Sequence, residues 1–422
     1  MKVMVVGSGG REHAIIRKIK ENKQVDRIYA LPGNGGMAGD AILVDIQAKD
    51  IAGITAFAKE NEIDYAIVAP DDPLVLGCVD SLEAAGIPCF GPNKRAAIIE
   101  GSKAFAKDLM YRYNIPTAAY ETFTDIEAAL RYVRKAPVPT VIKADGLALG
   151  KGVVIAESRV EAEKAIIAMM EEKKFGASGD TIVIEEFLKG PEVSVLAFTD
   201  GNVIVPMVSS MDHKRIGDGD TGLNTGGMGT VAPNPYYTKE IADECMEKIF
   251  LPTMRAMNRE NRKFKGCLYF GLMLTEDGPK VIEYNCRFGD PETQVVLPLL
   301  ASDLLTVMQA VTNEKLAQTR VEFLDSHACC VICASKGYPE SYEKGKELTI
   351  DEAISKYVYV AGAKLNSDGR LVTNGGRVAG VTAVAASLEA AIDMAYARAS
   401  GVAFEGKYMR KDIGTRALKA LK

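Results

Sequence analysis

The chain has 422 residues, of which 47% are hydrophobic and 25% are charged, and its formal net charge is −5 at pH 7. Since there is no basic excess to neutralise a nucleic-acid backbone, nucleic acid is excluded as the main partner. No apolar run reaches the ~20 residues of a membrane span, and the first apolar run is too short for a signal peptide. We therefore expect a cytoplasmic enzyme that acts on small molecules. We expect a monomer of about two to four domains with no membrane partner.

The N-terminal part of the chain alternates between strand-like and helix-like segments. Such alternation is typical of βαβ units in a parallel sheet, whose ligands lie at the carboxyl ends of the strands. We predict a Rossmann-like substrate-binding domain over residues 1–92. Its strands are expected at residues 2–6, 27–30, 65–69 and 88–90, and its helices at 11–20, 50–61 and 73–85.

The turn after the first strand reads Gly7-Ser8-Gly9-Gly10-Arg11-Glu12-His13. A dinucleotide-binding fingerprint fails here, because Glu12 stands where the third glycine should be and no acid follows the second strand. Backbone amides at a helix start beside Arg11 suit a phosphate group. A tight turn that needs only glycine is the alternative. Asn34, after the second strand, lies on the same predicted rim.

Two lysines follow the linker at residues 91–93. Lys103 lies within a helix predicted over residues 96–113, and Lys143 lies within an apolar strand predicted over 140–144. Because an unpaired buried charge is costly, Lys143 is expected to have an anionic partner, and a phosphate is the interpretation we favour.

A glycine-rich hairpin at residues 145–152 joins that strand to another at 153–156. Its amides could lie over a polyphosphate. It is not a P-loop, because Gly152 follows Lys151 where Ser or Thr is required. A helix is predicted at 159–173, and then strands at 181–188 and 191–198. These strands bring acids beside an apolar run, for which exposed edge residues are the alternative interpretation: Glu185, Glu186 and Glu192.

Residues 209–230 contain six glycines and few apolar residues, yet they lie between predicted core elements. A long irregular loop inside a compact domain is usually functional or disordered. Its mixture of Asp, His, Lys, Arg, Asn and Thr favours a binding loop. Neither an EF-hand nor a Gly/Ser linker fits the pattern.

A predicted hairpin of strands 267–274 and 280–284 follows a helix at 238–261, in which Pro252 is expected to cause a kink. Glu283 and Asn285 are two residues apart, so on a strand they project from the same face. Such oxygen ligands suit Mg²⁺. Arg287 continues the alternation and could hold an anion. A strand end with a solvated polar turn is the alternative.

A helix predicted at 292–312 closes this region, and from residue 328 the pattern changes to strands with one helix at 388–400. The turn containing Arg377 could be explained by Asn-Gly hairpin chemistry alone. Cys329, Cys330 and Cys333 contain a C-x-x-C spacing without a second pair, so a reduced core strand is expected.

Together these features resemble an ATP site without a P-loop, as in the ATP-grasp fold. In their order and spacing the motifs resemble the phosphoribosylamine–glycine ligase (glycinamide ribonucleotide synthetase) family along essentially the whole chain. The motifs that carry the resemblance are those at residues 7–13, 100–103, 142–148, 150–153, 185–188, 212–215, 217–222, 224–229, 281–292 and 374–378.

The resemblance implies an α/β and α+β multidomain protein. Its central ATP-grasp region would span residues 93–327, with an ATP-covering lid at about 118–189, and an α+β domain would span 328–422. The implied enzyme is a ligase of purine biosynthesis. It would join glycine to 5-phosphoribosylamine with ATP, through glycyl phosphate, to give glycinamide ribonucleotide, ADP and phosphate. Another ATP-grasp carboxylate–amine ligase and a non-catalytic nucleotide-binding protein are the alternatives.

Matching positions also carry the family's site residues. The resemblance implies Mg²⁺, or Mn²⁺, at Glu283 and Asn285. Reacting groups would meet Arg287, Asp212 and Lys214. ATP would meet Lys103, Lys143, Gly150, Lys151, Gly152, Glu185, Glu186, Phe187, Leu188 and Glu192. The amine substrate would meet Gly9, Gly10, Arg11, Glu12, His13, Asn34, Asn224, Thr225, Gly226, Gly227, Asp290 and Arg377.

Two departures from the family pattern concern acids. Asp71 stands where relatives often have glutamate, which leaves its role open. The strand at 269–274 lacks the acidic metal ligand of other ATP-grasp enzymes, so phosphate oxygens and water would complete the coordination.

Overall fold

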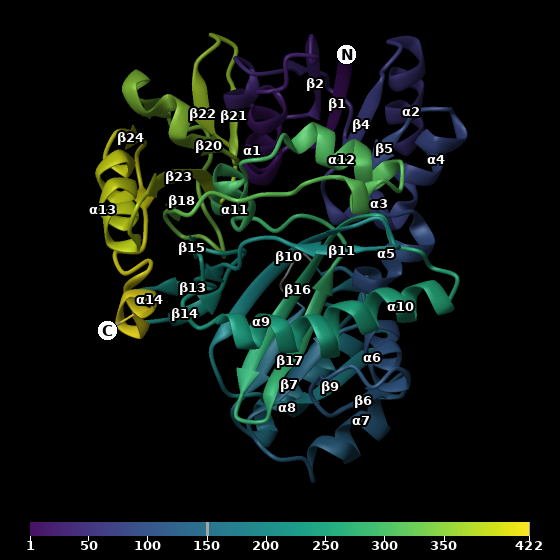
Figure 1. The fold of residues 1–422 in the computed structure, drawn as a ribbon. Coiled ribbons are helices and arrows are strands. Elements are labelled where there is room, and N and C mark those ends of the chain that lie inside the picture. The colour runs from purple at the N-terminus through teal and green to yellow at the C-terminus, as the bar shows by residue number, and fades with distance from the viewer. Residues whose placement is uncertain (149–151, 422) are drawn as a thin grey trace.

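The N-terminal region is a five-stranded parallel sheet in the order β3-β2-β1-β4-β5. It lies at the top of the computed structural model, which describes residues 1–148 and 152–421 (Figure 1). The predicted parallel sheet is confirmed, and the chain order reverses beside β1, where such folds bind ligands. Its elements are β1 (Lys2–Gly7), α1 (Gly10–Ile19), β2 (Arg27–Pro32), β3 (Ile42–Leu43), α2 (Ile51–Glu60), β4 (Tyr65–Val68), α3 (Asp71–Leu76), α4 (Cys78–Ala84) and β5 (Cys89–Phe90).

Three predicted helices are each divided in two. The first breaks at Gly77, whose φ of 93° is favoured by glycine. The second breaks at Ser102, which is extended and whose hydroxyl accepts from the amide of Phe105. The third breaks near Leu300, after Pro298. The first helix is thus divided into α3 and α4. The halves of the second are α5 (Lys94–Gly101) and α6 (Lys103–Arg112), and the halves of the third are α11 (Thr293–Leu299) and α12 (Leu304–Thr312).

The segment predicted to form the lid contains an antiparallel sheet in the order β6-β9-β7-β8, drawn at the bottom of Figure 1. Two helices cover it and share an apolar core with it, and the sequence pattern had not indicated the first strand or the first helix. The elements are β6 (Tyr120–Phe123), α7 (Ile126–Val133), β7 (Thr140–Ala144), β8 (Val153–Ala156), α8 (Arg159–Ile166) and β9 (Ile182–Glu186).

A second antiparallel sheet, in the order β11-β10-β16-β17, faces the lid. The predicted helix over 238–261 is α9, a π-helical turn and α10 in succession. The π turn lies directly before Pro252, where the missing backbone N–H interrupts regular helical bonding. The elements are β10 (Glu192–Thr199), β11 (Ile204–Pro206), α9 (Lys239–Cys245), α10 (Leu251–Arg259), β16 (Gly266–Thr275) and β17 (Gly278–Asn285).

The third sheet joins the glycine-rich segment to the C-terminal strands, with β12 and β15 beside β18 and β23. The prediction of an irregular loop at 209–230 is therefore wrong, because residues 211–212 pair with residues 230–231, residues 215–217 pair with residues 221–224, and β15 pairs with the distant β18. Ligand binding by this segment stays a prediction. The sheet spans residue 328, and the domain boundary there stays a prediction. The strands are β12 (Met211–Asp212), β15 (Gly229–Ala232), β18 (His327–Ser335), β20 (Val358–Val360), β23 (Arg377–Ala385) and β25 (Lys407–Tyr408).

The remaining C-terminal elements pack on this sheet or extend from its edge. Helix α13 (Leu388–Ala399) packs against β18 and β23. As expected, Cys329, Cys330 and Cys333 are free, buried thiols of β18. Among the described residues no helix is long and apolar enough to cross a membrane. The smaller elements are β13 (Arg215–Gly217), β14 (Thr221–Asn224), β19 (Thr349–Ile350), β21 (Ala363–Leu365), β22 (Leu371–Thr373), β24 (Val402–Ala403) and α14 (Thr415–Ala420).

Candidate active site

A β-bulge at the end of β17 sets the face on which its polar side chains lie. Gly271 pairs with Glu283, but Leu272 pairs with Val281, so Ile282 is the extra residue. After the bulge, Tyr284 is buried, and Glu283 points to the opposite face. The bulge thereby directs a row of polar side chains away from the core: Glu283, Asn285 and Arg287.

Glu283 is a carboxylate among cations. No hydrogen bond from a described residue reaches its oxygens. Burial raises the pKa of Glu283, but the charges of Lys214, Lys143, Lys103 and Arg287 outweigh burial and hold the pKa below its ordinary value. The opposite residue, Gly271, leaves room for this side chain, since a Cβ there would lie 3.1 Å from Glu283 Cγ. Glu283 therefore stays ionised and available to a ligand.

Lys143 has the anionic partner that its sequence context required. Its Nζ lies 2.9 Å from Oε1 of Glu185 and donates to the carbonyl of Ile282 at 3.0 Å. The bulge frees that carbonyl from the strand ladder. The contact with Glu185 is an ion pair without hydrogen-bond geometry, so the buried Oε1 keeps an unused acceptor site.

Lys107, which the sequence analysis missed, completes a buried trio with these two residues. Its Nζ lies 2.9 Å from Oε2 of Glu185 and donates to the hydroxyl of Thr117 at 2.8 Å. Burial lowers the pKa of Lys107 to about 8, although Glu185 acts in the opposite direction. Two lysines around one carboxylate leave a net positive charge beside the lid sheet.

Lys103 occupies the first turn of α6 and reaches the glycine-rich hairpin. Its Nζ donates to the carbonyl of Gly146 at 2.9 Å, and Asp145 caps the helix by accepting from Ser102 and the amide of Ala104. Burial lowers the pKa of Lys103. Of the predicted hairpin residues, Gly152 accepts from the amide of Ala144. Two predicted ligands lie outside the described residues: Gly150 and Lys151.

Arg287 lies between two acids from other elements. Its Nη2 is 2.9 Å from Glu100 and 3.9 Å from Asp71, while its buried Nε has no hydrogen-bond partner. Burial lowers the pKa of Arg287, but Glu100 and Asp71 outweigh burial and raise it. Glu100 and Asp71 thus fix the guanidinium group, and its buried Nε–H remains free to donate a hydrogen bond.

The segment after β9 lies at the surface beside the trio. Glu186 is exposed and accepts from the amide of Ala119 at 3.0 Å. Phe187 and Leu188 are half-buried, and Glu192 is exposed at the start of β10. These positions leave the predicted nucleotide contacts open to solvent.

The polar residues of 212–227 gather on the other side of Glu283. Lys214 Nζ donates to Asp212 at 3.2 Å, and Thr225 donates through its amide and hydroxyl to the Lys214 carbonyl. Burial raises the pKa of Asp212. Although burial acts against it, the negative groups around Lys214 raise the pKa of that lysine. Asn224 is exposed at the end of β14.

Arg377 links the 212–227 segment to Asp290 through hydrogen bonds. It donates to the carbonyls of Gly226 and Asp290 at 2.7 and 2.8 Å, and its Nη2 lies 3.4 Å from the Asp290 carboxylate. Nearby, Gly227 packs so closely on Asp212 that an added Cβ would lie 2.7 Å from a carboxylate oxygen. Predicted residues far apart in the sequence are thus brought together here.

The polar groups at the start of α1 mostly form hydrogen bonds and ion pairs with other groups of the protein. Glu12 accepts from the amide of Gly9 and pairs with Arg11, and Asp290 accepts from the amide of Arg11. Gly10 packs against the side chain of Gln294. Glu12 thus holds the start of α1 in place, and its contact with substrate stays a prediction.

His13 and Asn34 form hydrogen bonds with the backbone of the edge strand β20. Nδ1 of His13 accepts from the amide of Val360 at 2.9 Å, and Asn34 donates to the carbonyl of Val360 at 2.8 Å. The other ring nitrogen of His13 contacts Asp40 at 3.1 Å. Both side chains therefore join the N-terminal and C-terminal regions, and their contacts with substrate stay a prediction.

The buried His213 leads us to expect that the protein loses stability as the pH falls. The side chain is buried, it accepts at Nε2 from the amide of Gly414, and burial lowers its pKa to about 4. The unfolded chain binds this proton near pH 6.5. The contribution of His213 should therefore be complete above pH 6.5 and be lost as the pH falls toward 4, on the order of 2–3 kcal/mol.

Denaturant unfolding of the wild type and of His213→Asn at about pH 7.5 and about pH 5 measures this contribution. The variant should lose less stability between the two pH values, because carboxylates titrate alike in both proteins. Equal losses would contradict the assignment.

Three further residues lie at this site: Glu292, Tyr269 and Ser194. Glu292 is buried, with one oxygen 3.2 Å from the hydroxyl of Tyr269 and 3.5 Å from that of Ser194. Burial raises the pKa of Glu292, and Asp212 raises it further. Glu292 ends the 281–292 motif, but no local pattern indicated Tyr269 or Ser194 as its partners.

Comparisons with known proteins match the chain from end to end. Successive family models for phosphoribosylglycinamide synthetase match it: the N domain over residues 1–100, the ATP-grasp (A) domain over 101–293 and the C domain over 328–416. The phosphoribosylamine–glycine ligase of Caldanaerobacter subterraneus subsp. tengcongensis is 47% identical over 414 residues, 98% of this chain and 99% of that protein. That of Yersinia pestis is 47% identical over 424 residues, 99% of each chain.

Solved structures agree with these matches. The phosphoribosylamine–glycine ligase of Thermotoga maritima has a TM-score of 0.86 at 34% identity and covers 98% of this chain and 100% of its own. A biotin carboxylase–β,γ-ATP complex from Campylobacter jejuni, at 14% identity and a TM-score of 0.74, shows the fold alone. It covers 97% of this chain and 92% of its own.

Proposed function

The chain belongs to the phosphoribosylglycinamide synthetase family, and from that premise we propose that it joins glycine to 5-phosphoribosylamine with ATP, through glycyl phosphate. One observation carries this proposal. The charges of Lys214 from the 212–227 segment, of Lys143 from the lid sheet and of Arg287 after β17 all act on Glu283. This is the arrangement that phosphoryl transfer to a carboxylate and capture by an amine require. Neither alternative ligase activity nor mere nucleotide binding gains support from the relatives.

ATP is proposed to bind between the lid sheet and β17. The unused oxygen of Glu185 can accept from the adenine amino group, with Glu186, Phe187 and Leu188 beside it and Glu192 near the ribose. Lys103 and Lys143 would meet the phosphates, and the hairpin that ends at Gly152 would cover them. Two fixed ammonium groups neutralise charge without reorganisation during the transfer.

Glycine is proposed to bind with its carboxylate at Arg287. The unused Nε donor supports this, since a carboxylate can accept from it. A carboxylate oxygen attacks the γ-phosphorus, ADP leaves, and glycyl phosphate results. Glu100 and Asp71 hold the guanidinium group in place. Exclusion of water by the lid protects the acyl phosphate from hydrolysis.

Glu283 and Asn285 are proposed to hold Mg²⁺ or Mn²⁺. A carboxylate without a described donor suits a hard cation. When bound, the ion would neutralise the transferring phosphoryl group. No group of three or more His, Cys, Asp or Glu side chains in residues 1–148 and 152–421 could hold a metal alone. Because four cationic side chains surround Glu283, the metal is expected to enter together with the phosphates.

The amine substrate is proposed to bind across the 212–227 segment. Its nitrogen attacks the acyl carbon, phosphate leaves, and the nitrogen loses a proton. Lys214 and Asp212 lie beside one another at this place. The ribose phosphate would meet Arg377, with Asp290 and the start of α1 behind it. Asn224, Thr225, Gly226 and Gly227 would line the remainder.

Release of ADP tests the function. With ATP, Mg²⁺, glycine and freshly generated phosphoribosylamine, turnover should require every component, and glycinamide ribonucleotide should form in equal amount. Omission of each component in turn is the control. A folded protein that releases no glycine-dependent ADP would overturn the proposal, and a preference for another acid would indicate a different ligase.

A further inference from the structure

The hairpin of β13 and β14 depends on contacts from the end of the chain. It forms its own two-stranded sheet, and residues 218–224 are exposed. An isolated two-stranded hairpin is marginally stable in water. The hairpin carries Lys214 at its base, and Thr225 fixes the other end to the Lys214 carbonyl. Displacement of the hairpin would therefore move both residues.

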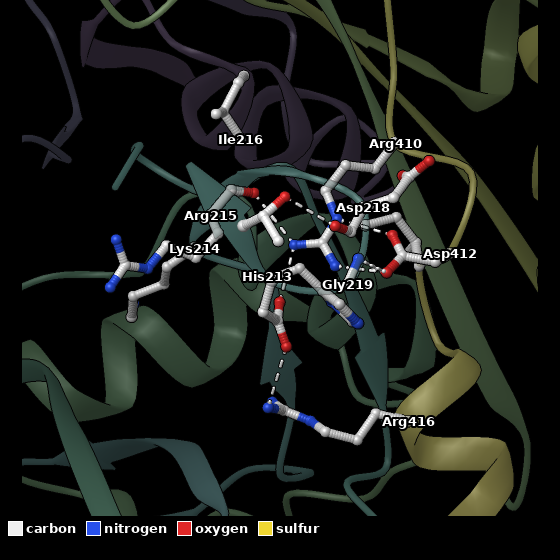
Figure 2. A network of polar contacts seen from close by, with 12 residues as sticks. His213, Lys214, Arg215, Ile216, Asp218, Gly219, Arg410, Asp412 and Arg416 are labelled. Atoms are coloured by element: carbon white, nitrogen blue, oxygen red, sulfur yellow. Dashed lines mark hydrogen bonds and ion pairs between the residues drawn. The ribbon is translucent and has the colours of Figure 1, made fainter. Parts of the chain in front are cut away.

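Arg410 is the centre of the contacts that hold the hairpin (Figure 2). Its side chain is only 1% exposed, although it is charged. It donates to the carbonyl of Arg215 at 3.0 Å and to Asp220 at 2.9 Å, and it makes two bonds of 2.8 Å with Asp412. One guanidinium group thereby joins Arg215 in β13 and Asp220, which directly precedes β14, to the C-terminal segment.

Neighbours of Arg410 add contacts along residues 213–220. Five further hydrogen bonds link the two segments, and four of their donors belong to the C-terminal segment. The hydroxyl of Tyr408 donates to Ile216, the amide of Lys411 to Asp218, the amide of Gly219 to Asp412, the amide of Gly414 to His213, and Arg416 to Asp220.

The chemistry of Arg410 is not interchangeable with that of lysine. A planar guanidinium group can bind two oxygens of Asp412 while it also reaches Asp220 and a carbonyl, and an ammonium group cannot repeat that geometry. Burial makes each lost bond costly, because the acids would remain partly desolvated without a partner. A lysine keeps the charge, so the global fold should survive while the hairpin loosens.

We propose that Arg410 is a positioning residue for the acceptor step: it locks the β13–β14 hairpin so that Lys214 and Thr225 meet the amine substrate. The proposal rests on the proposed function, in which this segment lines the acceptor site. Arg410 touches no substrate in this arrangement. Its loss should therefore affect the amine substrate and leave the nucleotide site, which is formed by other elements, unchanged.

Arg410→Lys tests the proposal, with Lys411→Ala as the matched control. Lys411 is adjacent and exposed, and no described contact involves its side chain. In Arg410→Lys the KM for phosphoribosylamine should rise about tenfold or more, while the Kd for ATP stays within about twofold. Amide hydrogen exchange over residues 214–225 should become faster. Lys411→Ala should resemble the wild type in all three measurements.

Each outcome is decisive. Unchanged exchange over residues 214–225 would overturn the locking role, whatever the activity. Faster exchange with an unchanged KM for phosphoribosylamine, or equal losses for ATP and glycine, would overturn the positioning role. If Arg410→Lys does not fold, Asp412→Asn, which retains Arg410, should show the same pattern. A wild type without glycine-dependent turnover would overturn the function but would leave the exchange result valid.

Discussion

Glu283→Gln should lower kcat by at least ~100-fold, because outer-sphere partners of a metal already contribute 10–100-fold and Glu283 is a direct ligand in our proposal. Glutamine keeps the shape of the side chain but removes its charge. No hydrogen bond from a described residue ends on the carboxylate, so folding should not depend on it. The effect should appear in turnover with saturating ATP and glycine, while circular dichroism stays unchanged.

Glu276→Gln is the matched control for that variant. It lies in the turn between β16 and β17 of the same hairpin and is exposed. It should retain wild-type turnover. Near-normal turnover of Glu283→Gln would mean that the metal site lies elsewhere. Partial recovery of Glu283→Gln turnover when Mn²⁺ replaces Mg²⁺ would support the assignment.

Lys143→Met should weaken ATP binding by about 30- to 100-fold, the effect of losing a charge-assisted contact to phosphate in a buried site. The fold should tolerate this change, since Lys107 still neutralises Glu185. Calorimetric titration with ATP and Mg²⁺ measures the affinity, and thermal unfolding checks the fold.

Lys135→Met is the control within the lid, where its side chain is exposed. It should leave the ATP affinity unchanged. An unaltered affinity in Lys143→Met would refute the contact with phosphate. A large loss of thermal stability would instead show that Lys143 acts mainly as the partner of Glu185.

The positive field around Glu283 links these two predictions. Lys103, Lys143, Lys214 and Arg287 all lower the pKa of Glu283. The same charges repel a free cation and attract a polyphosphate. The site is thus suited to a metal–nucleotide complex rather than to the metal alone, and the order of assembly follows from Coulombic energy.

The sequence by itself determined the parallel N-terminal sheet, three strands of the lid sheet (β7, β8 and β9) and the β16–β17 hairpin. Local periodicity and glycine turns are sufficient to indicate these elements, because the apolar pattern and the turn residues that mark each strand or helix lie within a few positions of one another. It also indicated which polar residues stand at strand ends. The functional family followed from the same motifs in order, and the relatives confirm that family.

Only the tertiary structure decided the breaks, the pairings and the partners. Ser102 ends a helix because its hydroxyl caps the next one, and the bulge at Ile282 appears only in the register with Gly271. Lys107 meets Glu185, and Arg410 meets Asp220, across 78 and 190 positions of the chain. Buried charges need partners, but no local pattern specifies which distant residue supplies them, because that choice is made by packing.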